Sequence, residues 1–215
     1  MKKIHRLFMV LLMPLLALSI TANAAKYTEG DQYTKVSETA STNVEVREYF
    51  SVYCGHCFQF EPIMHDIKKQ LPDNVKFERN HVDFLGGVSP TIQQMITKSI
   101  AIAEQLENSD KYIGAIFNYI HVQRATITTE KDLRNIFVLN GADGEQFDKL
   151  SKSFSVNAHA KAMKKHQDVM SQKRALTGVP TVIVNGKYRV NSGALDKSNP
   201  KEDYKNLINY LLTIK

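Results

Sequence analysis

Residues 44–62 read VEVREYFSVYCGHCFQFEP, and this stretch holds both cysteines of the 215-residue chain, Cys54 and Cys57. Its first seven residues are rich in β-branched and aromatic side chains, which predicts a strand over 44–50. After Cys54, apolar residues recur at helical intervals, at Phe60, Ile63, Met64, Ile67 and Leu71. Pro62 lies inside this predicted helix, and we expect it to kink the helix. The two cysteines therefore lie where a strand passes into a helix.

The spacing of the two cysteines predicts a redox-active dithiol. With two residues between them, Cys54 and Cys57 can close a small, easily reduced ring at the start of a helix, where the helix dipole stabilises the first thiolate. A structural disulfide would gain little stability from so short a loop. A four-thiolate zinc site would need a second cysteine pair. Covalent haem attachment would need a histidine at position 58, which is Phe58.

The first 24 residues have the three parts of a signal peptide. These are a basic start with Lys2, Lys3 and Arg6, an apolar run over 7–20, and the small-residue cleavage site Ala22-Asn23-Ala24. The apolar run is shorter than the roughly 20 residues that span a membrane. We therefore expect cleavage after Ala24 rather than an uncleaved anchor, and export to a compartment where disulfides persist.

The charge balance does not indicate a nucleic-acid-binding protein. The formal net charge is +6, and the three basic residues of the leader account for half of it. The sequence has no stripe of Lys and Arg interleaved with aromatic residues. A chain of this size can bury an adequate core without disulfides. We therefore expect the two cysteines to serve chemistry rather than stability.

The mature chain shows strand and helix patterns in three blocks. Residues 75–83 predict a second strand, which completes a β-α-β unit with the dithiol at its first turn. Between residues 90 and 174, apolar positions recur at helical intervals with little strand signal. The third block contains strands over 181–184 and 187–190 around the turn pair Asn185-Gly186, a strong hairpin signal, and a helix over 200–214.

This layout predicts an α/β protein with a thioredoxin fold and an inserted helical domain. We expect residues 25–88 and 175–215 to form the thioredoxin-like domain, and residues 89–174 to form the insertion. Cys54-Gly55-His56-Cys57 followed by Pro62 resembles the active-site helix of the thioredoxin superfamily, and the dithiol itself resembles that of protein disulfide isomerase.

The wider context resembles the DsbA family of bacterial periplasmic thiol:disulfide oxidoreductases. The similar stretches are Tyr49-Phe50-Ser51, Phe58-Gln59-Phe60-Glu61, His81-Val82-Asp83-Phe84-Leu85-Gly86-Gly87, Gly178-Val179-Pro180 and Val184-Asn185-Gly186-Lys187-Tyr188. The family commonly has Pro-His between the cysteines, whereas this chain has Gly55-His56. Glycine leaves the first helical turn looser than proline does, so the oxidising strength of the family does not carry over directly.

The residues of the dithiol motif suggest distinct roles. We expect Cys54 to form the mixed disulfide with the substrate and Cys57 to act as the resolving thiol. His56 can offer a ring N–H or a positive charge to the Cys54 thiolate. A thiolate stabilised in this way favours the reduced form, which makes the disulfide a stronger oxidant.

The resemblance implies supporting residues outside the motif. It implies a cis peptide bond before Pro180, with Val179 and Pro180 binding the substrate peptide along an exposed backbone edge. It also implies that Glu48, Glu61 and Arg79 cluster beneath the dithiol, where Glu48 could accept or supply the Cys57 proton. The apolar loop at 84–88 is either part of a substrate groove or buried in its own domain.

We therefore expect a monomeric periplasmic dithiol oxidase that acts on unfolded exported proteins with free cysteines and needs no metal or organic cofactor. The resemblance implies that a DsbB-like membrane oxidase regenerates it. An isomerase or reductase that uses the same sulfurs is one alternative, favoured by Gly55-His56. A holdase or metal-binding module whose cysteines grip a soft cation is another.

Overall fold

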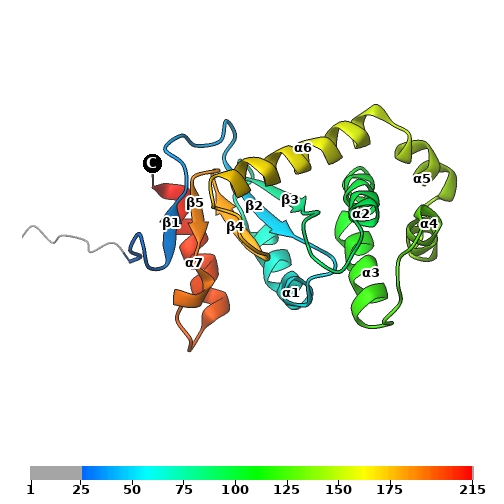
Figure 1. Ribbon diagram of the computed structural model, residues 1–215. Coiled ribbons are helices and arrows are strands. Elements are labelled where there is room, and N and C mark those ends of the chain that lie inside the picture. Colours follow the sequence, from blue (N-terminus) through cyan, green and yellow to red (C-terminus); the bar gives the residue numbers. More distant parts are fainter. Residues whose placement is uncertain (1–25, 215) are drawn as a thin grey trace, which may run out of the picture.

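The computed structural model describes residues 26–214, so the predicted leader and its cleavage site after Ala24 lie outside the described residues. A five-stranded sheet runs through the molecule in the order β1-β5-β4-β2-β3 (Figure 1). In this sheet β2 and β3 pair in parallel, and the other neighbours pair antiparallel. The strands are β1 (Tyr33–Lys35), β2 (Glu45–Phe50), β3 (Lys76–His81), β4 (Thr181–Val184) and β5 (Tyr188–Val190).

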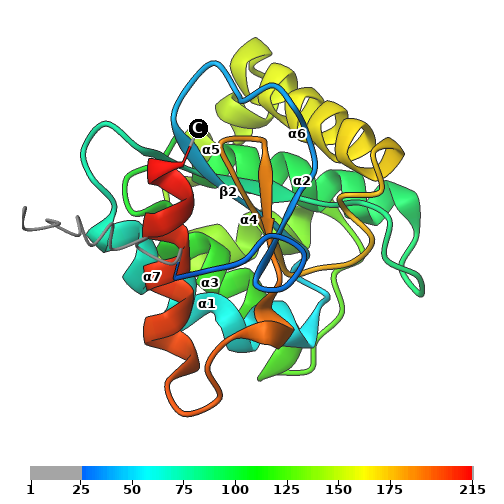
Figure 2. The same cartoon turned by 90° about the vertical axis from the view of Figure 1, so that its left-hand side faces the viewer.

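Helices cover both faces of the sheet. On one face lie α1 (Gly55–Gln70) and α7 (Pro200–Thr213), whose apolar sides pack against alternate residues of β2, β4 and β5. The end of α6 (Phe154–Gln172) covers part of the other face, where Met170 packs with Tyr49. Figure 2 shows the two layers, with α7 and α1 on one side of the strands and α6 on the other. This alternation of faces follows from the two-residue period of the strands.

Five consecutive helices connect β3 to β4, as the periodicity of the sequence predicts. Side chains of Ser89, Thr129, Asp143 and Ser153 cap four of them by accepting backbone N–H groups. The helices are α2 (Pro90–Ala103), α3 (Ser109–His121), α4 (Glu130–Leu139), α5 (Gly144–Ser151) and α6. Their core includes Phe50 and Cys57, so the helical block packs directly on the dithiol end of the sheet.

The strands and helices expected from the sequence are present, and the thioredoxin fold with a helical insertion is confirmed. The exact division into domains at residues 88, 89, 174 and 175 stays a prediction. Strand β1 was not predicted, because three residues are too few to show an alternating pattern. No helix within residues 26–214 has the length and apolar character needed to span a bilayer.

The predicted hairpin between β4 and β5 is confirmed by its turn. Asn185 and Gly186 have φ values of 53° and 62°, so both central residues of the turn are left-handed. This is the backbone of a type I′ turn, which matches the twist of the flanking strands.

Gly186→Ala should lower the free energy of unfolding by about 1 kcal/mol, because an L-residue with a side chain is strained at this φ. Gly193→Ala is the matched control, since Gly193 has no left-handed φ and open space around its Cα. Urea denaturation of both variants measures the difference. Equal stability of the two variants would contradict the prediction.

Candidate active site

Cys54 lies at the amino terminus of α1, as the sequence predicts. It is the N-cap residue of the helix, and its sulfur accepts the backbone N–H of Cys57 at 3.2 Å. The same sulfur donates to the backbone carbonyl of Val179 at 3.4 Å. A helix terminus with an N–H aimed at the sulfur stabilises negative charge there.

Cys57 is in a different environment one turn deeper. Its side chain is fully buried, whereas Cys54 is partly exposed. Burial, together with the neighbouring Cys54, raises the pKa of the Cys57 thiol well above its ordinary value. Exchange with an external thiol can therefore begin at Cys54, while Cys57 stays protonated and shielded.

The peptide bond between Val179 and Pro180 is cis, as the resemblance implies. Pro180 and His56 line a shallow pocket of about 330 Å³ whose apolar wall includes Phe60, Ile63 and Tyr204. His56 is exposed and makes no hydrogen bond or ion pair within the described part of the chain. The hydrogen bonds of the Cys54 sulfur within the described residues therefore go to Val179 and Cys57, and none goes to His56.

Glu48, Glu61 and Arg79 come together beneath the dithiol, as expected. Arg79 binds the Glu61 carboxylate with both terminal nitrogens, and its Nε lies 3.1 Å from Glu48 Oε2. The guanidinium also lies over the ring of Phe50, 4.2 Å from the ring centre. Glu48 is fully buried, and within residues 26–214 neither of its oxygens has an aligned hydrogen-bond donor.

Burial sets the protonation of Glu48. Loss of solvation raises the pKa of Glu48 to about 7, and the attraction of Arg79 only partly offsets this. A carboxyl with such a pKa can both give and take a proton near neutral pH. Because its charge also raises the pKa of Cys57, the two groups lie close enough to interact.

His121 is a site residue that the sequence analysis missed. Its Nε2–H donates to the carbonyl of Val52 at 2.8 Å, and its ring stacks on Phe58 at 5.1 Å between centres. This joins the end of α3 to the loop before Cys54 and to the first turn of α1. The available signal was spacing, since His121 follows Phe117 by four residues and so lies on the apolar side of that helix.

A partly exposed sulfur with a buried thiol three residues later suits thiol–disulfide exchange, because one sulfur can form a mixed disulfide and the other can resolve it. On a thioredoxin-like sheet, this pair defines the class of thiol:disulfide oxidoreductases. Within residues 26–214, no group of three or more His, Cys, Asp or Glu side chains is placed to hold a metal ion.

Comparison with known proteins narrows this class to one family. Residues 45–205 match the DSBA-like thioredoxin domain family, and the chain belongs to it. The thiol:disulfide interchange protein DsbA of Escherichia coli K12 is 34% identical over 202 residues, covering 91% of this chain and 93% of the relative. That of Yersinia pestis is 33% identical over 206 residues, covering 93% and 95%.

Solved structures give the same result. The crystal structure of DsbA from Proteus mirabilis has a TM-score of 0.76 and 30% identity, covering 88% of this chain and 99% of that one. A cysteine-to-serine variant of that protein in complex with a non-covalently bound peptide, PWATCDS, has a TM-score of 0.77, also at 30% identity, covering 88% of this chain and 100% of that one. The present protein is thus a thiol:disulfide oxidoreductase of the DsbA type.

The raised pKa of Glu48 has a consequence for stability. Between about pH 4.5 and pH 7 the folded protein holds a proton on Glu48 that the unfolded chain releases, so this group's contribution to stability is lost as pH rises. Glu48→Gln should remove this loss. The variant should gain stability relative to wild type across this window, by at most about 1.4 kcal/mol per pH unit.

The difference in free energy of unfolding between wild type and variant isolates Glu48, because His81 is present in both proteins. The effect of His81 on stability has the opposite sign to that of Glu48. Burial lowers the pKa of His81 to about 3, so its contribution to stability grows as pH rises from that value to 6.5. Glu107→Gln, at an exposed position, is the control. Its free energy of unfolding should differ from that of wild type by a constant amount at every pH. Urea denaturation from pH 4 to 8 gives the comparison, and a constant difference for Glu48→Gln would contradict the assignment.

Proposed function

We propose that the protein is a dithiol oxidase whose Cys54–Cys57 disulfide oxidises exported proteins. A substrate thiolate attacks Cys54, which breaks the Cys54–Cys57 bond and forms a mixed disulfide. A second substrate thiolate then attacks the substrate's own sulfur and displaces Cys54 as a thiolate. The substrate loses two electrons and two protons, and the enzyme gains them.

The observation that carries this proposal is the contrast between the two sulfurs. Cys54 is reachable and receives an N–H from the helix start, so it is a good leaving group in the second step. Cys57 is buried with a raised pKa, so it must take up a proton when it leaves in the first step. Glu48 is the proposed donor of that proton, directly or through water, because its pKa of about 7 keeps a proton available.

Val179 and Pro180 are the proposed substrate-binding residues. The Val179 carbonyl lies at the Cys54 sulfur, and Pro180 opens onto the apolar pocket beside His56. An extended peptide attached at Cys54 can pair with this backbone and place a side chain in the pocket. The structure of the relative from Proteus mirabilis in complex with a bound peptide supports this proposal.

We also propose a setting for the reaction, based on the family. We place the mature protein in the periplasm as a monomer, after removal of residues 1–24. A DsbB-like membrane oxidase would return its dithiol to the disulfide. The helical insertion over 89–174 and the thioredoxin-like domain over 25–88 and 175–215 are the proposed domains.

Trapping with a peptide whose single cysteine forms a disulfide with glutathione tests the roles of the two cysteines, because a thiolate of the protein can attack that disulfide and displace glutathione. Cys57→Ser should accumulate a mixed disulfide through Cys54, because the resolving thiol is gone. Cys54→Ser should accumulate little, because Cys57 is fully buried. Non-reducing electrophoresis and mass spectrometry measure the adducts. Equal trapping by both variants would show that the nucleophile is misassigned.

The reduction potential separates an oxidase from a reductase. Gly55 is the first residue of α1, a helix position where proline is common, and a Cβ added there meets nothing within 4 Å. Proline should fix the first turn that aims the Cys57 N–H at Cys54 and stabilise the reduced form. Each 1.4 kcal/mol of that preference corresponds to about 30 mV.

We expect a wild-type potential near −180 mV or more oxidising, and a shift of Gly55→Pro toward a stronger oxidant. Gly55→Ala is the control for adding a side chain without fixing φ. Equilibration with glutathione measures all three proteins. A wild-type potential near −270 mV, with the oxidised form the more stable, would make the protein a reductase.

A further inference from the structure

The positive charge of the chain is concentrated on one helix. Residues 152–174, which contain α6, hold six basic residues and one acidic residue, a net charge of +5. The formal net charge outside the leader is +3, so the other residues together carry a net charge of −2. The six basic side chains are all exposed, at Lys152, Lys161, Lys164, Lys165, Lys173 and Arg174. Such a separation of charge favours an anionic partner at α6.

The inner side of α6 is fixed to the sheet. Met163, Gln167 and Met170 of this side are buried. Asn80 of β3 donates its side-chain N–H to the carbonyl of Met163 at 3.0 Å. The side-chain oxygen of Gln167 accepts the N–H of Asp83 at 2.8 Å. These contacts fix the rotation of the helix about its axis, so its outer side faces away from the sheet as a fixed surface.

The outer side of α6 combines cations with apolar side chains. Lys161 and Lys165 lie four residues apart on one side of the helix, and Phe154 precedes Lys161 by about two turns on the same side. Phe154 is 88% exposed and Val169 is 37% exposed. We call the exposed side chains of Phe154, Lys161, Lys164, Lys165, Val169 and Lys173 the basic face. An exposed helix face with basic and apolar residues is typical of helices that bind a membrane surface.

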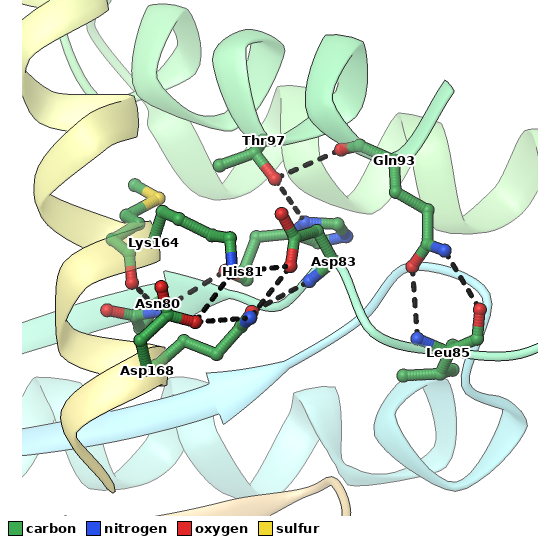
Figure 3. Close-up of polar contacts among 10 residues, drawn as sticks. Asn80, His81, Asp83, Leu85, Gln93, Thr97, Lys164 and Asp168 are labelled. Atoms are coloured by element: carbon green, nitrogen blue, oxygen red, sulfur yellow. Dashed lines mark hydrogen bonds and ion pairs between the residues drawn. The ribbon is translucent and has the colours of Figure 1, made fainter. Parts of the chain in front are cut away.

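Two acids beside the basic face share a single lysine. Lys164 lies 2.6 Å from the Asp168 carboxylate and 3.6 Å from that of Asp83 (Figure 3). The Asp83 carboxylate also accepts an N–H of Gln167 at 2.7 Å. Both acids are therefore directed toward Lys164 and leave the charge of the other lysines in place.

The other lysines of the basic face have no acidic partner within residues 26–214. Lys161 and Lys165 make no ion pair or hydrogen bond there. Lys173 donates to the hydroxyl of Ser37 at 3.2 Å, which is a neutral partner. Three positive charges of one fixed surface are thus available to an external anion.

Lysines of the basic face also line two cavities beside α6. A cavity of about 450 Å³ between α6 and the loop over residues 37–41 is lined by Lys165 and Lys173. A cavity of about 290 Å³ between α6 and α2 is lined by Lys161, Lys164 and Lys98. Ammonium groups around a hollow suit the phosphate of a lipid headgroup.

We propose that the basic face docks on a bilayer that contains anionic phospholipids. The lysines bind headgroup phosphates, and Phe154 lies at the level of the headgroups. The helix lies on the bilayer rather than across it, because its inner side is bound to the sheet. The inference is independent of the proposed oxidase function, since no residue of the basic face belongs to the dithiol site.

Sedimentation with lipid vesicles tests the proposal. Vesicles of equal parts phosphatidylglycerol and phosphatidylcholine provide the anionic surface, and vesicles of phosphatidylcholine alone provide the neutral one. Wild type is compared with the double variant Lys161→Gln/Lys165→Gln and with Phe154→Ser. Heparin, a soluble polyanion, is the second probe.

A matched double variant, Lys197→Gln/Lys201→Gln, removes the same charge from another surface. Lys197 and Lys201 are exposed and make no ion pair within the described residues. They lie just before and within α7, which is on the opposite side of the strands from α6 (Figure 2). Comparison of the two double variants therefore separates the basic face from net charge.

Wild type should bind the anionic vesicles at low salt and not the neutral ones, and added salt should release it. Lys161→Gln/Lys165→Gln should weaken vesicle binding about 25-fold, because each cation at an anionic surface contributes about fivefold. Phe154→Ser should weaken binding to vesicles but not to heparin, because only a bilayer takes up the ring. Lys197→Gln/Lys201→Gln should bind like wild type.

Failure of wild type to bind the anionic vesicles at low salt would overturn the proposal. Equal weakening in the two double variants would also overturn it, because net charge alone would then explain the binding. Binding to heparin without binding to vesicles would assign the basic face to a soluble polyanion instead. All substituted side chains are exposed, so the fold should persist, and urea denaturation verifies this.

Discussion

β2 and β3 run side by side in the same direction, and their register places Glu48 opposite Arg79 and Phe50 opposite His81. The positions of two loops depend on this pairing. The Cys54 loop and the loop over residues 83–88 leave neighbouring strands at the same edge of the sheet. The ion pairs beneath the dithiol depend on this pairing too. Glu48 and Arg79 lie side by side under α1, and Glu61 of that helix binds Arg79. A slip of one residue would turn all these side chains to the opposite face.

The sheet contains a second buried ion pair, between Arg47 and Glu45. Its geometry differs from that of Glu48 and Arg79, and the difference bears on which carboxyl holds a proton near neutral pH. On the opposite face of β2, Arg47 binds Glu45 with two hydrogen bonds of 3.1 and 2.9 Å, so both carboxylate oxygens have donors. Glu48 has only the proximity of Arg79, whose terminal nitrogens are taken by Glu61. An incompletely satisfied buried carboxylate favours its neutral form. The structure thus leaves one incompletely paired carboxyl near Cys57, and this carboxyl is the proton donor that we propose for the first step.

The sequence predicts the parts of this protein that local patterns encode. The dithiol at a strand–helix junction, the helices and the Asn185-Gly186 turn all follow from neighbouring residues. The meeting of Glu48, Glu61 and Arg79 was expected only from family resemblance, since 18 residues separate Glu61 from Arg79 along the chain. His121 and Gln167 could not be predicted in this way. Gln167 meets Asp83 across 84 residues, and a buried glutamine in a helix has no local pattern that distinguishes it from a solvated one.

The contacts of the insertion argue that it belongs to the active site rather than being an addition to it. Its α3 contributes His121, which binds the carbonyl of Val52 just before the dithiol, and Phe50 and Cys57 lie in its apolar core. Its helices α2 and α6 bind the loop that follows β3 through Gln93 and Gln167. The sulfurs lie at the start of α1, and the buried acid Glu48 lies in β2. What the insertion adds is support for the two loops at this edge of the sheet, because its helices bind the backbone of both.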